Sequence, residues 1–491
     1  MSSLPAQPPN QAQESSTDRS FFGHPRMLAN LFAVEMWERF SYYGMQAIML
    51  YYLYYSVADG GLGLDKSAAT GVMGAYGGMV YLLAILGGFL GDRVLGPERT
   101  LFYSAITIML GHIALALIPG FTGVVIGLIL VAVGSGCLKT NSTVLVGSLY
   151  SRSDTRRDGG FTIFYMGVNL GAFIGPLLTG FFQQKWGFHL GFGLAALGMA
   201  LGLLQYGLTR KQLPESVHRL SDPLTAPEKR NYSLAGLGVL LLLLPLILTN
   251  RITPDNLDVW VMSLISIFAL LLFILLLRSK KTSSQEHSRV LAFIPLFVGN
   301  TVFWSLFQQQ FTVLAIYSDT RVNWNIAGTE FPHSWFQSIN PVFILTFGAV
   351  FTALWTKLGQ RQPSSPQKFA LALMLIGLAF LIFLIQAGNT SVNILWLVLI
   401  LFVCTMGELM IGPPGQSLTS QLAPQAHRVY MMSLYFCSLA MGTVIAGWLA
   451  SFYSLETEQT YFTSLGFTAI AVGLLLLALN KRILKLMVGV R

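Results

Sequence analysis

Charged residues are scarce in this chain of 491 residues. Asp, Glu, Lys and Arg together make up 10% of it, whereas soluble globular domains carry about 25%. Hydrophobic residues make up 54%, and the mean hydropathy is +0.61. This composition excludes a soluble globular protein and indicates a polytopic membrane protein.

Cysteine and catalytic motifs are also sparse. Cys137, Cys404 and Cys437 lie in apolar segments without CxxC or Cys/His spacing, so we expect neither disulfides nor a metal site. No HExxH, GxSxG, Ser/His/Asp arrangement or nucleotide-binding loop occurs, which argues against a membrane-embedded enzyme. His112, inside an apolar segment, is interpreted as a packing residue. We therefore expect no catalytic residue and no cofactor.

The net charge of +9 does not indicate nucleic-acid binding. The basic residues are scattered between apolar segments, and no basic stripe interleaves with aromatic residues. The N-terminal stretch MSSLPAQPPNQAQESSTDRS has no apolar core and no small-residue cleavage site. Residues 1–26 are therefore predicted to be a disordered cytoplasmic tail rather than a signal peptide.

Apolar runs of about 20 residues predict about fourteen transmembrane helices. Their approximate spans are 28–55, 70–91, 99–118, 122–149, 160–183, 188–208, 233–250, 258–278, 289–318, 335–358, 368–387, 392–421, 428–453 and 461–487. Arg39 and Lys139 fall inside helices. Of the remaining Lys and Arg residues, the loops on one side hold only Lys66, Lys185, Arg251 and Arg321. The positive-inside rule then places both termini in the cytoplasm.

The helices divide into groups of six and eight at a basic linker, residues 209–232. Within the eight, the helices at 233–250 and 258–278 have almost no polar residue, so they can face lipid all round. Residues 233–280 are interpreted as a peripheral two-helix insertion. Six helices at 27–208 and six at 281–491 then remain, which is the all-α major facilitator fold with a central site between its halves. The loop GDRVLGPERT fits that superfamily's cytoplasmic loop pattern.

Five charged residues interrupt the predicted helices: Glu35, Glu38, Arg39, Lys139 and Glu408. A charge at the centre of a membrane helix costs roughly 2.5 to 3.5 kcal/mol. The first three share one helix face, since they stand at positions i, i+3 and i+4. A buried ion-pair network that only locks helices together is one explanation. A pathway for a polar solute is the favoured one, because it needs such groups where lipid-facing helices avoid them.

Lys139 and Glu408 lie in opposite six-helix halves. A cation in one half and an anion in the other suit a zwitterionic substrate that bridges them. The run Gly412, Pro413, Pro414 and Gly415 follows Glu408 and predicts a kinked or unwound helix there, or a static kink without functional consequence.

The residues that have now been described resemble a known family, the proton-dependent oligopeptide transporters. EMWERFSYYG at 35–44 is similar to that family's helix-one signature, Glu-x-x-Glu-Arg-Phe-x-Tyr-Tyr-Gly. The likeness continues through GGFLGDR, LKTN, FYMGVNLGAF, WFQSINP and GELMIGPPGQSLTSQLAP, and so covers essentially the whole chain. It includes the two extra helices typical of bacterial members.

The resemblance implies a proton-coupled symporter that imports di- and tripeptides by alternating access. It implies that Arg39 and Lys139 hold the peptide carboxylate and that Glu408 and Asn340 hold the ammonium group. Proton coupling would involve Glu35 and Glu38 together with both cations. The remaining substrate-binding residues that it implies are Tyr43, Tyr81, Tyr165, Asn169, Gln308 and Tyr435. It further implies a bacterial inner-membrane location and a monomer.

Three positions depart from the family's pattern. Gln308 stands where many members carry Asp or Glu, which puts a second proton-linked salt bridge in doubt. Tyr435 replaces a common Trp, and Thr140 replaces the usual Pro after Lys139. Other readings stay open: a transporter of another small zwitterion or of an anion, such as the nitrate-type relatives, or a peptide sensor that does not transport.

Overall fold

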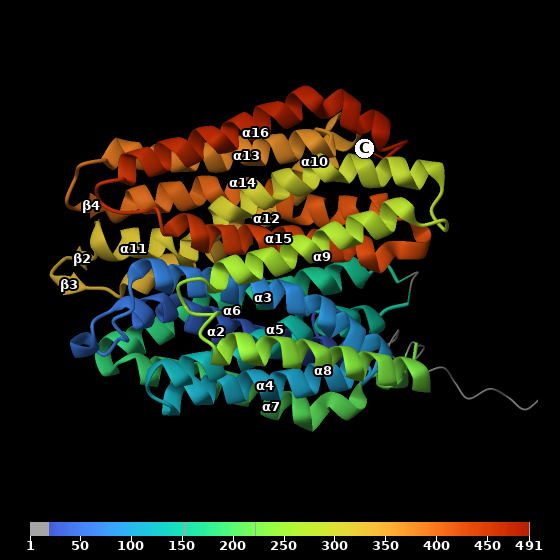
Figure 1. The fold of residues 1–491 in the computed structure, drawn as a ribbon, viewed down its shortest axis with the longest axis horizontal. Helices are drawn as coiled ribbons and strands as arrows, with labels where there is room; N and C mark the ends of the chain where they lie inside the picture. Colours follow the sequence, from blue (N-terminus) through green and yellow to red (C-terminus); the bar gives the residue numbers. More distant parts are fainter. Residues whose placement is uncertain (1–18, 152–153, 221, 491) are drawn as a thin grey trace, which may run out of the picture.

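The computed structural model describes residues 19–151, 154–220 and 222–490, and nearly all of them lie in helices that run along one axis (Figure 1). Thirteen of these helices are long and apolar enough to cross a membrane. Helix α2 (Arg26–Tyr54) runs among them but carries Glu35, Glu38 and Arg39 at its centre. The prediction of about fourteen membrane helices in an all-α fold is confirmed.

The first six long helices pack together, with α2 against α6 and α7, and α5 against α3 and α4. The other five are α3 (Lys66–Arg93), α4 (Pro97–Leu117), α5 (Gly120–Ser148), α6 (Arg157–Trp186) and α7 (Phe188–Thr209). Short 3₁₀ segments lie between them or follow them, namely η1 (Val57–Asp59), η2 (Arg210–Gln212) and η3 (Glu215–His218).

The second group also contains six membrane crossings, several of which are built from more than one segment. In chain order the segments are α10 (Ser284–Phe307), η4 (Gln308–Phe311), α11 (Val313–Thr320), η5 (His333–Ser338), α12 (Ile339–Leu358), η6 (Gly359–Arg361), α13 (Ser365–Ile382), η7 (Phe383–Gln386), α14 (Ile394–Leu422), η8 (Gln425–His427), α15 (Arg428–Ala450) and α16 (Glu458–Leu486).

Four two-residue strands lie at one end of the molecule, the end opposite the C-terminus (Figure 1). β1 (Val322–Asn323) pairs in parallel with β4 (Val392–Asn393), and β2 (Asn325–Ile326) pairs antiparallel with β3 (Thr329–Glu330). They join the loops before α12 and α14 into a small cap over that end of the second group.

The expectation of one continuous helix at 289–318 is wrong, and of the options for the helix with Pro413 and Pro414 the unwound one is not found. The span 289–318 is not one helix, because η4 interrupts it and Thr312 leaves helical geometry with φ −131° and ψ −94°. A 3₁₀ turn inside a helix often marks a hinge. In contrast, α14 continues through Pro413 and Pro414 without unwinding. Proline removes an N–H donor but does not break a helix whose neighbours support it.

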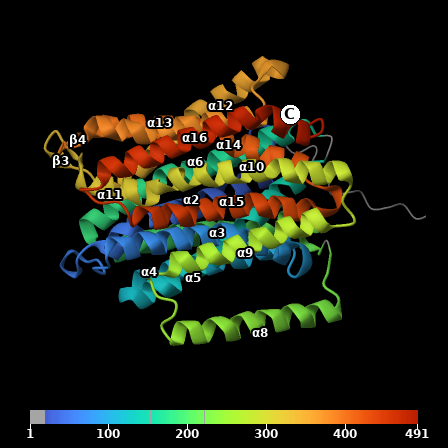
Figure 2. The ribbon, with the colours of Figure 1, turned by 45° about the horizontal axis from the view of Figure 1, so that its top comes forward.

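The two helices predicted to be a peripheral insertion differ in how much of their surface is buried. Helix α8 (Ala226–Leu248) is exposed on all sides, and Figure 2 shows it standing apart from the other helices. Helix α9 (Leu257–Arg278) instead buries Val261, Ile265 and Ala269 and packs against α3 and α15. The expectation that such helices face lipid all round therefore fits α8 and is wrong for α9, which touches both halves.

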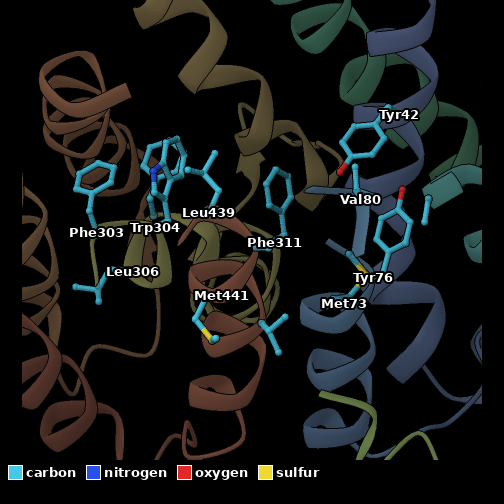
Figure 3. Packing of buried hydrophobic residues seen from close by; sticks show 14 of the residues in the cluster. Tyr42, Met73, Tyr76, Val80, Phe303, Trp304, Leu306, Phe311, Leu439 and Met441 are labelled. Carbon is cyan, nitrogen blue, oxygen red and sulfur yellow. The ribbon is translucent and has the colours of Figure 1, made fainter. Parts of the chain in front are cut away.

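The halves contact each other most closely where α3 meets α15. A Cβ atom added to Gly74 would lie 2.7 Å from the Cα of Gly447, so neither position has room for a side chain. Further along the interface, Figure 3 shows apolar side chains of α10 and α15 on one side and of α2 and α3 on the other, with Phe311 between them. Glycine at these two positions is thus required by the close approach of two backbones.

Replacing Gly447 with Leu should separate α3 from α15. Overpacking of this kind costs about 1 to 3 kcal/mol, so Gly447→Leu should lower the melting temperature of the detergent-solubilised protein. Gly238→Leu is the matched control, because Gly238 lies on the exposed helix α8 and an added Cβ there meets nothing within 4 Å. Equal melting temperatures for the two variants would contradict this account of the contact.

Candidate functional site

A cavity of about 2540 Å³ lies between the two halves. It runs from Gln46 and Gln337 to the loop residues Gln362 and Pro363 between α12 and α13. The cavity therefore reaches the end of the bundle that holds the α12–α13 loop and stops short of the end that holds the strands. Its wall includes these predicted site residues: Glu35, Arg39, Tyr43, Tyr81, Lys139, Tyr165, Asn169, Gln308, Asn340, Glu408 and Tyr435.

Arg39 is the centre of a buried cluster on α2. Its Nε lies 2.9 Å from Glu35 Oε1 and 2.9 Å from Glu38 Oε2. The Nε hydrogen bond goes to Glu35, so Oε2 of Glu38 has an ion-pair contact but no hydrogen bond among the described residues. Ser135 Oγ on α5 donates to the other Glu38 oxygen at 2.9 Å. Glu38 is fully buried behind the cavity wall and is the one predicted site residue that does not line it.

Lys139 on α5 lines the cavity close to this cluster. Its Nζ lies 4.5 Å from the centre of the Tyr81 ring, a cation–π contact. Within the described ranges it has no carboxylate partner closer than 4.0 Å, whereas Arg39 has two. In this conformation both acids of α2, Glu35 and Glu38, are therefore paired with Arg39, and the ammonium group of Lys139 can bind a ligand in the cavity.

Glu408 on α14 lies in the opposite half. Asn340 Nδ2 on α12 donates to Glu408 Oε2 at 3.0 Å and to Thr405 Oγ1 at 2.9 Å. The carboxylate is thus oriented by an amide and has no cationic partner within 4.0 Å in the described part of the chain. Among the predicted site residues, the cavity thus has two cations on the wall of one half and an unneutralised anion on the wall of the other.

The remaining predicted residues hold the walls together. Gln308 Nε2 donates to the Tyr81 hydroxyl at 3.3 Å and so links α3 to η4 across the halves. Tyr435 donates to the carbonyl of Gly412 at 3.2 Å, which places it against the proline-containing part of α14. Asn169 is bonded within its own helix, to the carbonyl of Tyr165 at 2.9 Å.

The cavity wall also contains polar residues that the sequence analysis did not identify. Gln46, Gln310 and Gln337 lie toward the strand end, and Lys368 lies near the opposite mouth, with its Nζ 4.3 Å from the Trp355 ring centre. Glutamine carries no charge, so it does not stand out in a membrane helix as the five charged residues do. The one available signal was position: Gln46 lies a helical turn beyond Tyr43 on the face that already carried the charged stripe.

The strand end of the cavity is closed by a group of residues that we call the latch: Tyr54, Tyr55, Asp319 and His333. The hydroxyls of Tyr54, the last residue of α2, and of Tyr55, which follows it, donate to the two Asp319 oxygens at 2.5 Å and 2.6 Å. His333 Nδ1 lies 2.7 Å from the same carboxylate. Since the tyrosines belong to one half and Asp319 to the other, these bonds hold the halves together at this end.

Backbone acceptors extend the closure beyond the latch. Trp335 Nε1 donates to the carbonyl of Leu177 at 2.9 Å, and Ser338 Oγ donates to the carbonyl of Phe173 at 2.8 Å. Both bonds join η5 to α6, again across the halves. The structure is thus closed at the strand end and open at the other.

Comparisons with known proteins agree with this architecture. A family model described as the POT family matches residues 98–466, which is most of the chain. An uncharacterized transporter of Bacillus subtilis (strain 168) is 42% identical over 97% of this chain and 98% of its own length. A di-/tripeptide transporter of Lactococcus lactis subsp. cremoris is 40% identical over 97% and 99%. The crystal structure of the peptide transporter POT in complex with sulfate has a TM-score of 0.93 at 44% identity, covering 98% and 99%.

Weakening the latch should favour opening at the strand end. Asp319→Asn removes the charge that accepts two tyrosine hydrogen bonds, and hydrogen bonds to charged groups contribute about 1.5 to 3 kcal/mol each. Spin labels at Val57 and Ile326, exposed positions of opposite halves at this end, should then show a larger share of long distances. Cys137, Cys404 and Cys437 are buried, so labelling is confined to the introduced cysteines.

The matched control is Glu330→Gln. Glu330 also faces His333, at 4.0 Å, but it is exposed and bonds neither tyrosine. A distance distribution in Asp319→Asn that equals those of the wild type and of this control would show that the latch does not stabilise the closed end.

Proposed function

The chain belongs to the POT family of membrane transporters, and from this premise we propose that it imports di- and tripeptides together with protons by alternating access. Membership confirms the family predicted from EMWERFSYYG, and it makes the chain a transporter rather than an enzyme. The observation that carries the proposal is the charge arrangement of the cavity. Arg39 and Lys139 face it from one half, and Glu408 faces it from the other. A free peptide has the complementary charges at its two ends.

The carboxylate of the peptide binds Arg39 and Lys139. Arg39 uses its Nε for the acids on its own helix, and the guanidinium still has its terminal N–H groups for a second carboxylate. Lys139 adds a point charge beside Tyr81. Tyr43, Tyr81 and Tyr165 line this part of the cavity, and Asn169 and Gln308 supply further polar contacts to the peptide.

The amino terminus of the peptide binds Glu408. Asn340 orients that carboxylate and also lines the cavity, so it contributes a second polar group beside the ammonium. Tyr435 borders the same region. An anion transporter would have no use for an unneutralised carboxylate in its cavity, which is why a peptide is favoured over nitrate-type substrates.

Glu35 and Glu38 carry the proton. When a substrate carboxylate competes for Arg39 and Lys139, the acids lose part of their electrostatic support and take up a proton more readily. A zwitterion carried with one proton moves one net charge. That movement gains about 2.3 kcal/mol per 100 mV of membrane potential, enough for roughly fiftyfold accumulation.

The protein works in the bacterial inner membrane with both termini in the cytoplasm, and it works as a monomer. Most Lys and Arg residues outside the helix centres lie in the loops at the C-terminal end of the bundle, where the cavity opens. The conformation described above is then the inward-open state, and the latch closes the periplasmic side.

Uptake of labelled dialanine by reconstituted protein tests the proposal. Liposomes with an inward proton gradient should accumulate dialanine, and liposomes without one should only equilibrate it.

Lys139→Ala should abolish the accumulation yet retain exchange of dialanine across the membrane, because Glu35 and Glu38 keep Arg39 as a partner but lose Lys139 as a second cation. Lys485→Ala, a change at an exposed lysine on α16, is the control and should accumulate normally. Acid-driven accumulation by Lys139→Ala would rule out its role in coupling.

Glu408→Gln tests the ammonium site separately. The variant should lose at least tenfold in its apparent affinity for free dialanine, since removing one partner of a buried charge pair costs about 2 to 5 kcal/mol. N-acetyl-dialanine has no ammonium group, so its weaker binding should change far less. Glu456→Gln, at an exposed acid, should affect neither ligand. An equal loss for both ligands in Glu408→Gln would contradict the assignment.

A further inference from the structure

Three glutamines form the wall of the cavity next to its closed end. Gln46 comes from α2, Gln310 from η4 and Gln337 from η5, and all three line the cavity although each is at least nine-tenths buried. The Oε1 atoms of Gln46 and Gln337 are buried and have no hydrogen-bond partner among the described residues. An unpaired buried acceptor costs about 1 to 3 kcal/mol, so two of them in one wall require an explanation.

We propose that Gln46, Gln310 and Gln337 form a subsite that binds the side chain of a peptide carrying a carboxamide or hydroxyl group. The inference rests on the proposed function and adds a substrate class to it. Each amide has a donor and an acceptor and can turn about its terminal torsion. A ligand group that is also both donor and acceptor therefore satisfies this wall best.

The position of the subsite assigns it to a side chain rather than to either end of the peptide. Gln46 lies seven residues beyond Arg39 on a continuous helix, which places it about 10 Å further toward the latch. Gln337 precedes Asn340 by one helical turn, on the latch side of the ammonium site. Because Arg39, Lys139 and Glu408 hold the two ends of the peptide, the part of the peptide that can contact the three glutamines is a side chain.

The segment η4 fixes the third amide of the subsite. Gln309 points the other way, since its Oε1 accepts a bond from Tyr461 in the second half and it does not line the cavity. Phe311 stacks on Tyr43 with ring centres 6.4 Å apart, which holds η4 against α2. The 3₁₀ turn thus directs Gln310 to the cavity from a segment that contacts α2, the helix of Gln46.

The charges of the cavity explain why the ligand group should be neutral. The acids that line it are Glu35, already paired with Arg39, and Glu408, which is oriented by Asn340. A lysine side chain at the glutamines would be desolvated without a counter-ion, a large cost. A leucine side chain would offer the glutamine amides no hydrogen bond. Carboxamides and hydroxyls avoid both penalties.

Competition against labelled dialanine uptake gives the test. We measure inhibition constants of Ala-Gln, Ala-Leu and Ala-Lys with reconstituted wild type, Gln46→Met and Gln337→Met. Wild type should bind Ala-Gln more tightly than Ala-Leu, and each variant should reduce that ratio roughly three- to tenfold, the value of one neutral hydrogen bond. A ratio is independent of how much of a variant has folded.

Two further variants make the outcome decisive. Gln46→Glu adds the missing counter-ion and should shift the preference toward Ala-Lys, a gain that misfolding cannot produce. Gln309→Met is the matched control, from the same segment but facing away from the cavity, and should leave the ratio unchanged. Transport of dialanine with unaltered ratios in all Gln46 and Gln337 variants would overturn the subsite and leave the proposed function standing, with the amides binding only water. Absence of dialanine transport by the wild type would overturn both.

Discussion

The contact of Arg39 with Glu35 and Glu38 is the interaction on which the rest of this structure depends. Two carboxylates and one guanidinium cannot all be neutralised by each other, so the cluster is stable in a membrane only with outside help. Ser135 supplies a hydrogen bond, and Lys139 supplies a second cation that is near without being bound. The cluster therefore has equal numbers of positive and negative charges, while Oε2 of Glu35 and Oε2 of Glu38 have no hydrogen-bond partner among the described residues. Such a partly bonded cluster would suit the exchange of partners that we propose for Glu35 and Glu38.

Helix α2 connects this cluster to the latch. It is continuous from Arg26 to Tyr54, so an uninterrupted helical segment about 28 Å long joins Glu35 in the cluster to Tyr54 in the latch. The crossing that faces it from the other half is not continuous, because η4 divides α10 from α11 beside the cavity. When a rigid helix faces a hinged one, a change at the cavity can be taken up at the hinge while the latch residue Asp319 moves with the short segment α11.

The sequence predicted most of the fold because hydrophobic length and the distribution of Lys and Arg are strong signals in membrane proteins. It also predicted the charged members of the site, since Lys139 and Glu408 are costly in an apolar helix and so stand out. It failed where the signal is tertiary. The break at η4 has no proline or glycine to announce it, and α9 looks like a lipid-facing helix until its contacts with α3 and α15 are known. Pro413 and Pro414 left a kinked or an unwound helix open from sequence, and α14 stays helical through both prolines.

Uncharged polar residues explain the part of the site that the sequence did not reveal. Gln308 stands where many family members carry an acid beside the cavity, yet the same crossing carries Asp319 as its next-to-last residue, in the latch. The acid of this crossing is thus used to close the strand end, and the cavity-facing positions at Gln308 and Gln310 are left neutral. A carboxylate at either position would compete with Glu408 for a substrate ammonium. Glutamines there provide hydrogen bonding without that competition, so in the binding mode that we propose a peptide would be oriented by its terminal charges and distinguished by its side chain.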